Sequence, residues 1–158
     1  MTKMEARYSK LRKLMAENGL DAIYVNSPEN HLYMSEFDNP DGHIVITREK
    51  SFVFADPRYI EAAKAESCDL CTVCLPENPT LAEIVRDYGI KTIGYEDMRI
   101  TCAELDDVKK SVDGMGAEFC PLGKMFTEIR SIKTDDEIDA SNADYVDLSV
   151  LVGRSNAL

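Results

Sequence analysis

Short apolar runs alternate along this chain with segments that begin with helix-start signals, and this alternation limits the folds open to it. Such a signal is an N-cap residue followed by proline, or by glutamate three positions later. Five segments of this kind begin near Thr2, Ser27, Asp56, Asn78 and Thr101. The apolar runs, which we expect to be strands, cover residues 21–26, 43–47, 51–55, 68–74, 91–95 and 117–120. Strands that alternate with helices are typical of a sheet covered by helices on both faces.

The sequence therefore predicts an α/β fold with a six-stranded mixed β-sheet and one hairpin. Residues 43–47 and 51–55 form the hairpin, because only three residues separate them. The chain has 158 residues, which suits one domain of ordinary size. We place this domain at residues 1–133, with a last helix over 124–133. Residues 134–158 open with a further capping pattern but lose the helical period, so we predict a tail or the stump of a longer segment.

The charge of the chain argues against polyanionic partners. It carries 18 Lys and Arg against 29 Asp and Glu, a formal net charge of −11. Such a surface repels phosphate backbones and anionic lipid headgroups, so we expect no nucleic-acid and no membrane partner. No stretch of the sequence approaches the roughly 18 apolar residues of a membrane-spanning helix. Five cysteines, an odd number, favour reduced thiols and predict a cytoplasmic location.

Three of the cysteines form a C-x-x-C-x-x-C run at Cys68, Cys71 and Cys74. Three thiolates can bind zinc or an iron–sulfur cluster, or take part in redox chemistry. In an extended strand, however, side chains alternate between the two faces, so Cys71 would point away from the other two. A fourth ligand at suitable spacing is lacking, because Cys102 and Cys120 are distant in the sequence. We therefore favour a buried strand over a thiolate site.

The stretch from residue 30 to residue 43 is the best candidate for a binding site. It combines amide, aromatic, carboxylate and imidazole groups around a short helix and a Pro/Gly loop, and loops on a rigid sheet often carry binding groups. Asp38, Asp41 and His43 can bind a cationic group or relay a proton. The alternative is a loop with exposed polar side chains, in which Tyr33 and Phe37 belong to the core.

Catalytic motifs are lacking elsewhere in the sequence. Neither His31 nor His43 has the spacing of a metal-binding pair. The sequence has no nucleophile elbow, no P-loop and no dinucleotide-binding glycine motif. We therefore predict no catalytic residue and no metal ligand in this chain.

Several short motifs resemble, in their order and spacing, one known family. They are Arg7…Leu11-Arg12…Gly19-Leu20-Asp21-Ala22, Asn30…Tyr33-Met34-Ser35…Phe37, Phe54-Ala55-Asp56…Arg58-Tyr59, Ile93-Gly94…Glu96 and Ile129-Arg130-Ser131-Ile132-Lys133. Together they resemble the N-terminal domain of the creatinase/prolidase family, which comprises Xaa-Pro dipeptidases, Xaa-Pro aminopeptidases and creatinase. The resemblance runs from about residue 4 to residue 138.

The resemblance implies a ribonuclease H-like six-stranded sheet and a non-catalytic role. In the family, a following domain binds two divalent metal ions, such as Mn, Co or Zn, through two Asp, one His and two Glu, and the metals activate a bridging water. Those ligands would follow residue 138, so no metal or other cofactor is expected in this chain. The implied activity of the intact protein is hydrolysis of Xaa-Pro bonds in small proline-containing peptides.

The resemblance also implies partners and site residues. The family's N-terminal domain mediates homodimerisation, contacts its own C-terminal catalytic domain, and places a loop over the active site of the partner subunit to limit substrate length. The residues that match this gating or dimer-facing region are Asn30, Tyr33, Phe37, Asp38, His43, Arg58 and Tyr59. As alternatives, Asp56 and Arg58 only brace a helix, and Tyr33 and Tyr59 only pack.

The chain departs from the family pattern in one motif. Where the family has glycine before the phenylalanine of Y-L-[ST]-G-F, this chain has Glu36. A charged side chain without the backbone freedom of glycine is expected to alter the loop or its substrate contacts. A stand-alone interaction module without hydrolase activity and a creatinase-like amidinohydrolase remain as alternative functions.

Overall fold

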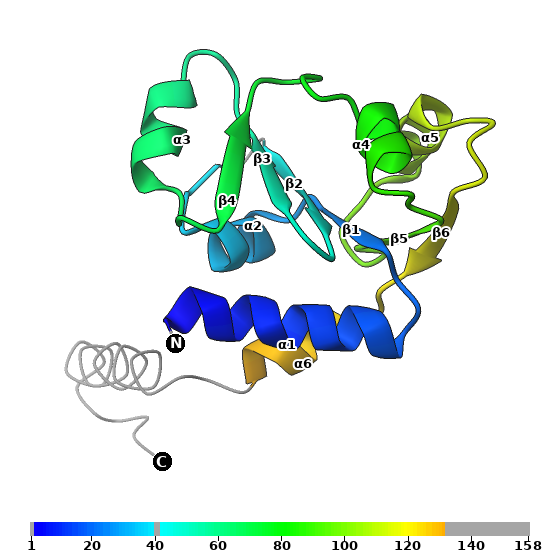
Figure 1. Ribbon diagram of the computed structural model, residues 1–158, viewed down its shortest axis with the longest axis horizontal. Coiled ribbons are helices and arrows are strands. Elements are labelled where there is room, and N and C mark those ends of the chain that lie inside the picture. The colour runs from blue at the N-terminus through cyan, green and yellow to red at the C-terminus, as the bar shows by residue number, and fades with distance from the viewer. Residues whose placement is uncertain (1, 40–41, 132–158) are drawn as a thin grey trace, which may run out of the picture. The chain divides into compact units, whose positions relative to one another are not determined.

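The computed structural model describes residues 2–39 and 42–131 and contains six helices and six strands within those residues (Figure 1). The helices are α1 (Lys3–Glu17), α2 (Pro28–Ser35), α3 (Ile60–Glu66), α4 (Leu81–Asp87), α5 (Cys102–Ser111) and α6 (Met125–Ser131). The strands are β1 (Ala22–Val25), β2 (His43–Thr47), β3 (Ser51–Phe54), β4 (Cys71–Cys74), β5 (Thr92–Tyr95) and β6 (Glu118–Pro121). Residues up to Phe126 form one compact unit. The predicted boundary at residue 133 and the tail 134–158 lie outside the described residues.

The six strands form one mixed sheet in the order β4-β3-β2-β1-β5-β6. The β2 strand pairs antiparallel with both β1 and β3, and the other neighbours pair in parallel. The predicted fold class is therefore confirmed, and so is the hairpin, which is β2 and β3. Because only β2 runs in reverse among these strands, β1, β3, β4, β5 and β6 all end at the same edge of the sheet.

The two faces of the sheet are covered by different helices, with α1 on one side and α4 and α5 on the other (Figure 1). Ser51 points toward α1, since its Oγ lies 2.8 Å from the hydroxyl oxygen of Tyr8. The next residue, Phe52, points the other way and contacts the ring of Tyr88 at the end of α4, 5.8 Å between centroids. This alternation within β3 explains why all four of its residues are buried.

Three of the predicted helix starts are confirmed at Thr2, Ser27 and Thr101, where each side chain accepts a hydrogen bond from the backbone N–H three residues later. The predicted start at Asn78 is wrong, because Thr80 caps α4. Thr80 and Glu83 bond reciprocally through side chain and backbone, and these two bonds satisfy two amide groups of the first turn.

The predicted helix start at Asp56 is also wrong. The Asp56 carboxylate accepts hydrogen bonds from the backbone and side-chain N–H groups of Arg58, at 2.9 and 3.0 Å. These bonds form a local turn, an arrangement that competes with a helical N-terminus. As a result α3 begins at Ile60, after Tyr59.

The cysteine run differs from the predicted continuous strand. Residues 68–70 form a turn and β4 begins only at Cys71, so the expected separation of Cys68 from Cys71 is wrong: their sulfur atoms lie 3.4 Å apart. The expected separation of Cys74 from Cys71 is right, because Cys74 belongs to the core under α4. Within residues 2–39 and 42–131, no three His, Cys, Asp or Glu side chains are grouped to hold a metal ion. In the same residues, no helix has both the length and the apolar character needed to cross a membrane.

Candidate functional site

Several of the predicted site residues lie along one edge of the sheet, which we call the carboxyl edge. Among the described residues, this edge consists of those that follow β1, β3 and β4 and those that precede β2. Asp38 and His43 lie before and at the start of β2, and Arg58 and Tyr59 follow β3. In open α/β sheets, ligands bind beside the carboxyl ends of the strands, so this edge is the candidate site.

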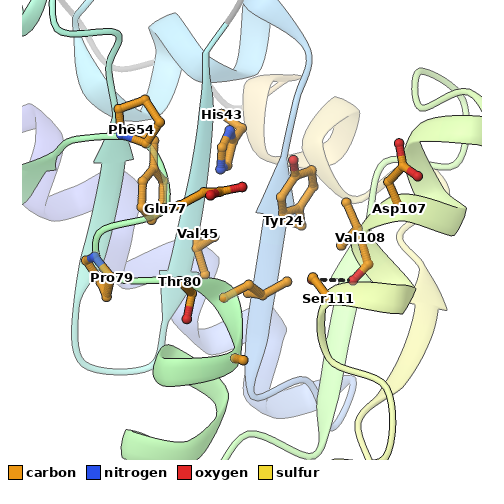
Figure 2. Close-up of a pocket in the computed structure, with 13 residues that line it drawn as sticks. Tyr24, His43, Val45, Phe54, Glu77, Pro79, Thr80, Asp107, Val108 and Ser111 are labelled. Carbon is orange, nitrogen blue, oxygen red and sulfur yellow. Dashed lines mark hydrogen bonds between the residues drawn. The ribbon is translucent and has the colours of Figure 1, made fainter.

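A pocket of about 530 Å³ opens beside His43 on the face of the sheet that α4 and α5 cover (Figure 2). The His43 ring lies between two other rings, 5.1 Å from that of Tyr24 and 4.7 Å from that of Phe54, and is stacked with both. Glu77, from the loop after β4, and Asp107, from α5, complete the polar lining together with Thr80 and Ser111. The pocket therefore joins an aromatic wall to two carboxylates.

Burial keeps the two titratable rings of this wall neutral. It lowers the pKa of His43 to about 4, with a smaller contribution from nearby His31, so the imidazole is uncharged at neutral pH. Burial and the charge of Glu104 raise the pKa of Tyr24 to about 12. A neutral imidazole both donates and accepts hydrogen bonds. With carboxylates nearby, this pocket suits a small ligand that has an apolar ring and a positive charge.

Asn30 takes part in an internal network rather than in the pocket. Glu96, which directly follows β5, is only 6% exposed, and its carboxylate accepts four hydrogen bonds. Two come from the backbone N–H groups of Asn26 and Ser27, at 2.7 and 2.8 Å, and two come from the side chains of Ser27 and Asn30. Glu96 thus fixes the N-terminus of α2 to the end of β5. Sequence reasoning did not assign it this role, although its position after a buried strand is a usable signal.

Tyr33 and Phe37 are held by the surrounding helices. The guanidinium of Arg7 lies 4.0 Å from the centre of the Tyr33 ring and donates a hydrogen bond to the Tyr33 carbonyl at 2.7 Å. Phe37 is buried, and its carbonyl oxygen lies 3.1 Å from Nδ1 of the fully buried His31. The structure therefore does not bring Tyr33 or Phe37 into the His43 pocket.

Arg58 and Tyr59 form an exposed pair on the carboxyl edge. The Arg58 guanidinium lies 5.3 Å from the centre of the Tyr59 ring, and 51% of Tyr59 is exposed. Asp56 accepts two hydrogen bonds from Arg58, and these bonds hold the pKa of that carboxyl below its usual value. An ordered arginine beside an exposed aromatic ring is a surface suited to contacts with another molecule.

Glu36 takes the backbone conformation that glycine favours. Its φ is +64° and its ψ is 8°, in the left-handed region, and it ends α2. Its carboxylate lies 3.4 Å from Nζ of Lys3. The glutamate therefore makes the left-handed turn despite its side chain, at some cost in backbone energy.

The sequence profile of the creatinase/prolidase N-terminal domain matches residues 7–132. The chain belongs to this family. An uncharacterised peptidase, YqhT, of Bacillus subtilis is 28% identical over 134 residues, which are 84% of this chain and 37% of that protein. The solved structure of the Xaa-Pro dipeptidase from Bacillus anthracis is 26% identical, with a TM-score of 0.75 over 87% of this chain and 38% of that one.

A third similar structure is the N-terminal domain of the cytoplasmic peptidase PepQ from Mycobacterium tuberculosis. It is 24% identical and has a TM-score of 0.71 over 78% of this chain and 98% of that domain, which shows the shared fold. The creatinase/prolidase N-terminal domain described here thus spans less than two fifths of the length of YqhT and of the Bacillus anthracis dipeptidase.

Proposed function

We propose that this creatinase/prolidase N-terminal domain is the non-catalytic part of an Xaa-Pro metallopeptidase, in which it supports homodimerisation and limits access of substrate. The observation that carries the proposal is the family match over residues 7–132 together with the short share of the relatives' length that the chain spans. The dipeptidase from Bacillus anthracis has the same fold in 38% of its length, which leaves most of that protein for other functions. We propose a cytoplasmic location, because the five cysteines are free thiols.

The carboxyl edge supports the gating part of the proposal. Arg58 and Tyr59 are exposed there. His43 and Phe54, which line the pocket, are paired at the same end of β2 and β3. A small peptide has a positively charged N-terminus, which Glu77 and Asp107 attract, and a proline ring, which the aromatic wall can pack against. In the dimer, this edge would lie over the partner's active site and restrict long peptides.

Catalysis in this proposal belongs to a C-terminal domain that is not within this chain. Two divalent metal ions, such as Mn, Co or Zn, would supply there an activated water and a polarised scissile carbonyl. The residues described here have no grouping of side chains that fits such a pair of ions. In this proposal, the residues of this chain position the substrate and exclude longer peptides.

The first experiment compares this chain with a protein extended by the coding sequence that follows residue 158. We expect no metal-dependent cleavage of Xaa-Pro dipeptides by the 158-residue chain, and cleavage by the extended protein. An extended protein that hydrolyses creatine would support the creatinase-like alternative. An extension without any hydrolase domain, or cleavage by the chain alone, would contradict the proposal.

The second experiment tests gating and dimerisation in the extended protein. Arg58→Ala and Tyr59→Ala are expected to raise kcat/KM for an Xaa-Pro tripeptide relative to the dipeptide by roughly threefold or more. Arg86→Ala, which removes another exposed arginine from α4, is the matched control and should leave the ratio unchanged. An unchanged ratio in all three variants would contradict gating, and a monomeric extended protein in sedimentation analysis would contradict dimerisation.

A further inference from the structure

The turn before the edge strand β4 brings two thiols together. The Cys71 N–H donates a hydrogen bond of 3.0 Å to the Cys68 carbonyl, so residues 68–71 form a β-turn. A β-turn keeps its first and last Cα atoms within about 7 Å, which overlaps the range that a disulfide requires. The two sulfur atoms are 3.4 Å apart. A disulfide bond is about 2.05 Å long, so a small rotation of the side chains is enough to form it.

We propose that Cys68 and Cys71 form a reversible dithiol–disulfide pair, in which Cys68 reacts first with a small disulfide from solution and Cys71 completes the intramolecular bond. The proposal concerns the α1 side of the sheet, away from the His43 pocket. It is therefore independent of the proposed peptidase role.

The two thiols have different surroundings, which give them different roles in the reaction. Cys68 is only partly buried and lines a depression of about 390 Å³, together with the start of α1, Glu36 and Leu70. This depression offers a small molecule a route to Cys68. The Cys71 thiol directed at Cys68 favours the thiolate of Cys68 and lowers its pKa to about 7. Cys68 therefore has more of the nucleophilic thiolate at neutral pH than an ordinary cysteine.

Cys71 is held on the inner side of the turn. Its sulfur lies 3.3 Å from the Tyr8 hydroxyl oxygen and 3.6 Å from the Met34 carbonyl oxygen. The hydrogen bond to Cys68 and burial raise the pKa of Cys71. Cys71 therefore stays a thiol until a mixed disulfide forms on Cys68, and it then becomes the attacking group.

The reaction consists of two exchanges. The Cys68 thiolate attacks one sulfur of a small disulfide RS–SR, the S–S bond of that molecule breaks, and one RS⁻ leaves. Cys71 then loses its proton to solvent and attacks Sγ of Cys68, which forms the Cys68–Cys71 bond and releases the second RS⁻. The two protein thiols are oxidised and the small disulfide is reduced to two thiols. A small thiol in excess reverses both exchanges.

Cys74 provides a matched comparison three residues further on. It is buried in the core under α4, and burial raises the pKa of its thiol. It therefore has neither the access nor the thiolate character of Cys68. A substitution at Cys74 leaves the pair intact.

The experiment treats the 158-residue chain with the uncharged bis(2-hydroxyethyl) disulfide, blocks free thiols by alkylation and maps the products by mass spectrometry. The wild-type chain should lose two hydrogen atoms in mass and yield a peptide with an internal Cys68–Cys71 bond. Cys71→Ser should stop at the mixed disulfide on Cys68, Cys68→Ser should form neither product, and Cys74→Ser should behave as wild type. In the wild-type chain, the rate of the first exchange, at Cys68, should rise with pH and reach half of its maximum near pH 7.

Two results would overturn the proposal. One is alkylation of both Cys68 and Cys71 after the treatment, which would show that they do not bond. The other is a first adduct on Cys102 or Cys120 while Cys68 stays free. Because the peptide map of the wild-type chain is enough to show either result, the test does not depend on the folding of any variant.

Discussion

The buried carboxylate of Glu96 provides the sharpest test of how this domain is held together. We predict that Glu96→Gln destabilises the fold, although it changes the size of the side chain very little. The carboxylate now accepts four hydrogen bonds, two at each oxygen. Glutamine has a single oxygen, so its NH₂ group must face either two backbone N–H donors or the side chains of Ser27 and Asn30.

The magnitude follows from the bonds that change. A hydrogen bond to a charged group contributes about 1 kcal/mol more than a neutral one, which gives about 4 kcal/mol for the four. A neutral amide is less costly to bury than a carboxylate, and the Ser27 hydroxyl can turn to accept a bond. We expect these gains to offset about half of this loss, so that the free energy of unfolding falls by about 2 kcal/mol.

Urea unfolding followed by circular dichroism measures this loss, as a decrease of about 1 M in the midpoint. Hydrogen exchange gives a local readout, because the amides of Asn26 and Ser27 should exchange faster. Glu118→Gln, at an exposed position on β6, is the matched control and should change stability by less than about 0.5 kcal/mol. If Glu96→Gln were as stable as this control, the network would not hold α2 as we argue.

Three further predictions concern single side chains. Glu36→Gly should stabilise the domain by about 0.5–1 kcal/mol in urea unfolding, because glycine relieves the cost of φ +64°, whereas Glu36→Ala, which keeps the Cβ, should not; equal effects would contradict this. His43 has a folded-state pKa of about 4 against about 6.5 unfolded, so its neutral form stabilises the fold fully above about pH 6.5 and that contribution is lost as pH falls toward 4. Between pH 7.5 and pH 5 the free energy of unfolding should fall by roughly 2 kcal/mol more in the wild type than in His43→Gln. Parallel profiles of this free energy against pH would refute the lowered pKa of His43. Tyr8→Phe removes the hydroxyl that donates to the Met34 carbonyl at 2.6 Å and should cost about 1–2 kcal/mol of unfolding free energy, while Tyr59→Phe at an exposed ring should be neutral; similar values would exclude a role for the buried bond.

The elements and the fold class were predictable because their signals are local. The capping pairs at Thr2 and Thr101 act within one turn of helix, and the three-residue gap after Thr47 requires a hairpin. The starts of α3 and α4 were misplaced, since Asp56 and Asn78 look like caps in sequence. The bonds that decide these starts are made by Arg58 and by Thr80 with Glu83, and several nearby polar groups compete for them.

The candidate site was only partly predictable. The sequence indicated the stretch from residue 30 to residue 43 and the residues after β3, but it could not separate His43, which lines a pocket, from Tyr33 and Phe37, which are held internally. This distinction between pocket residues and internal residues depends on which face of the sheet each side chain contacts. Glu77 and Asp107 reach the same pocket from distant parts of the chain, and no local pattern marks them.

The sequence by itself determined an acidic α/β domain with six strands and its family membership, because periodicity, capping and motif order are properties of neighbouring residues. The tertiary structure alone decided the contacts between distant residues. Glu96 meets Ser27 across the ends of two strands, and the turn before β4 places Cys68 against Cys71. Such contacts are fixed by strand order and by the start of each element, since a shift of one residue moves a side chain to the other face of the sheet.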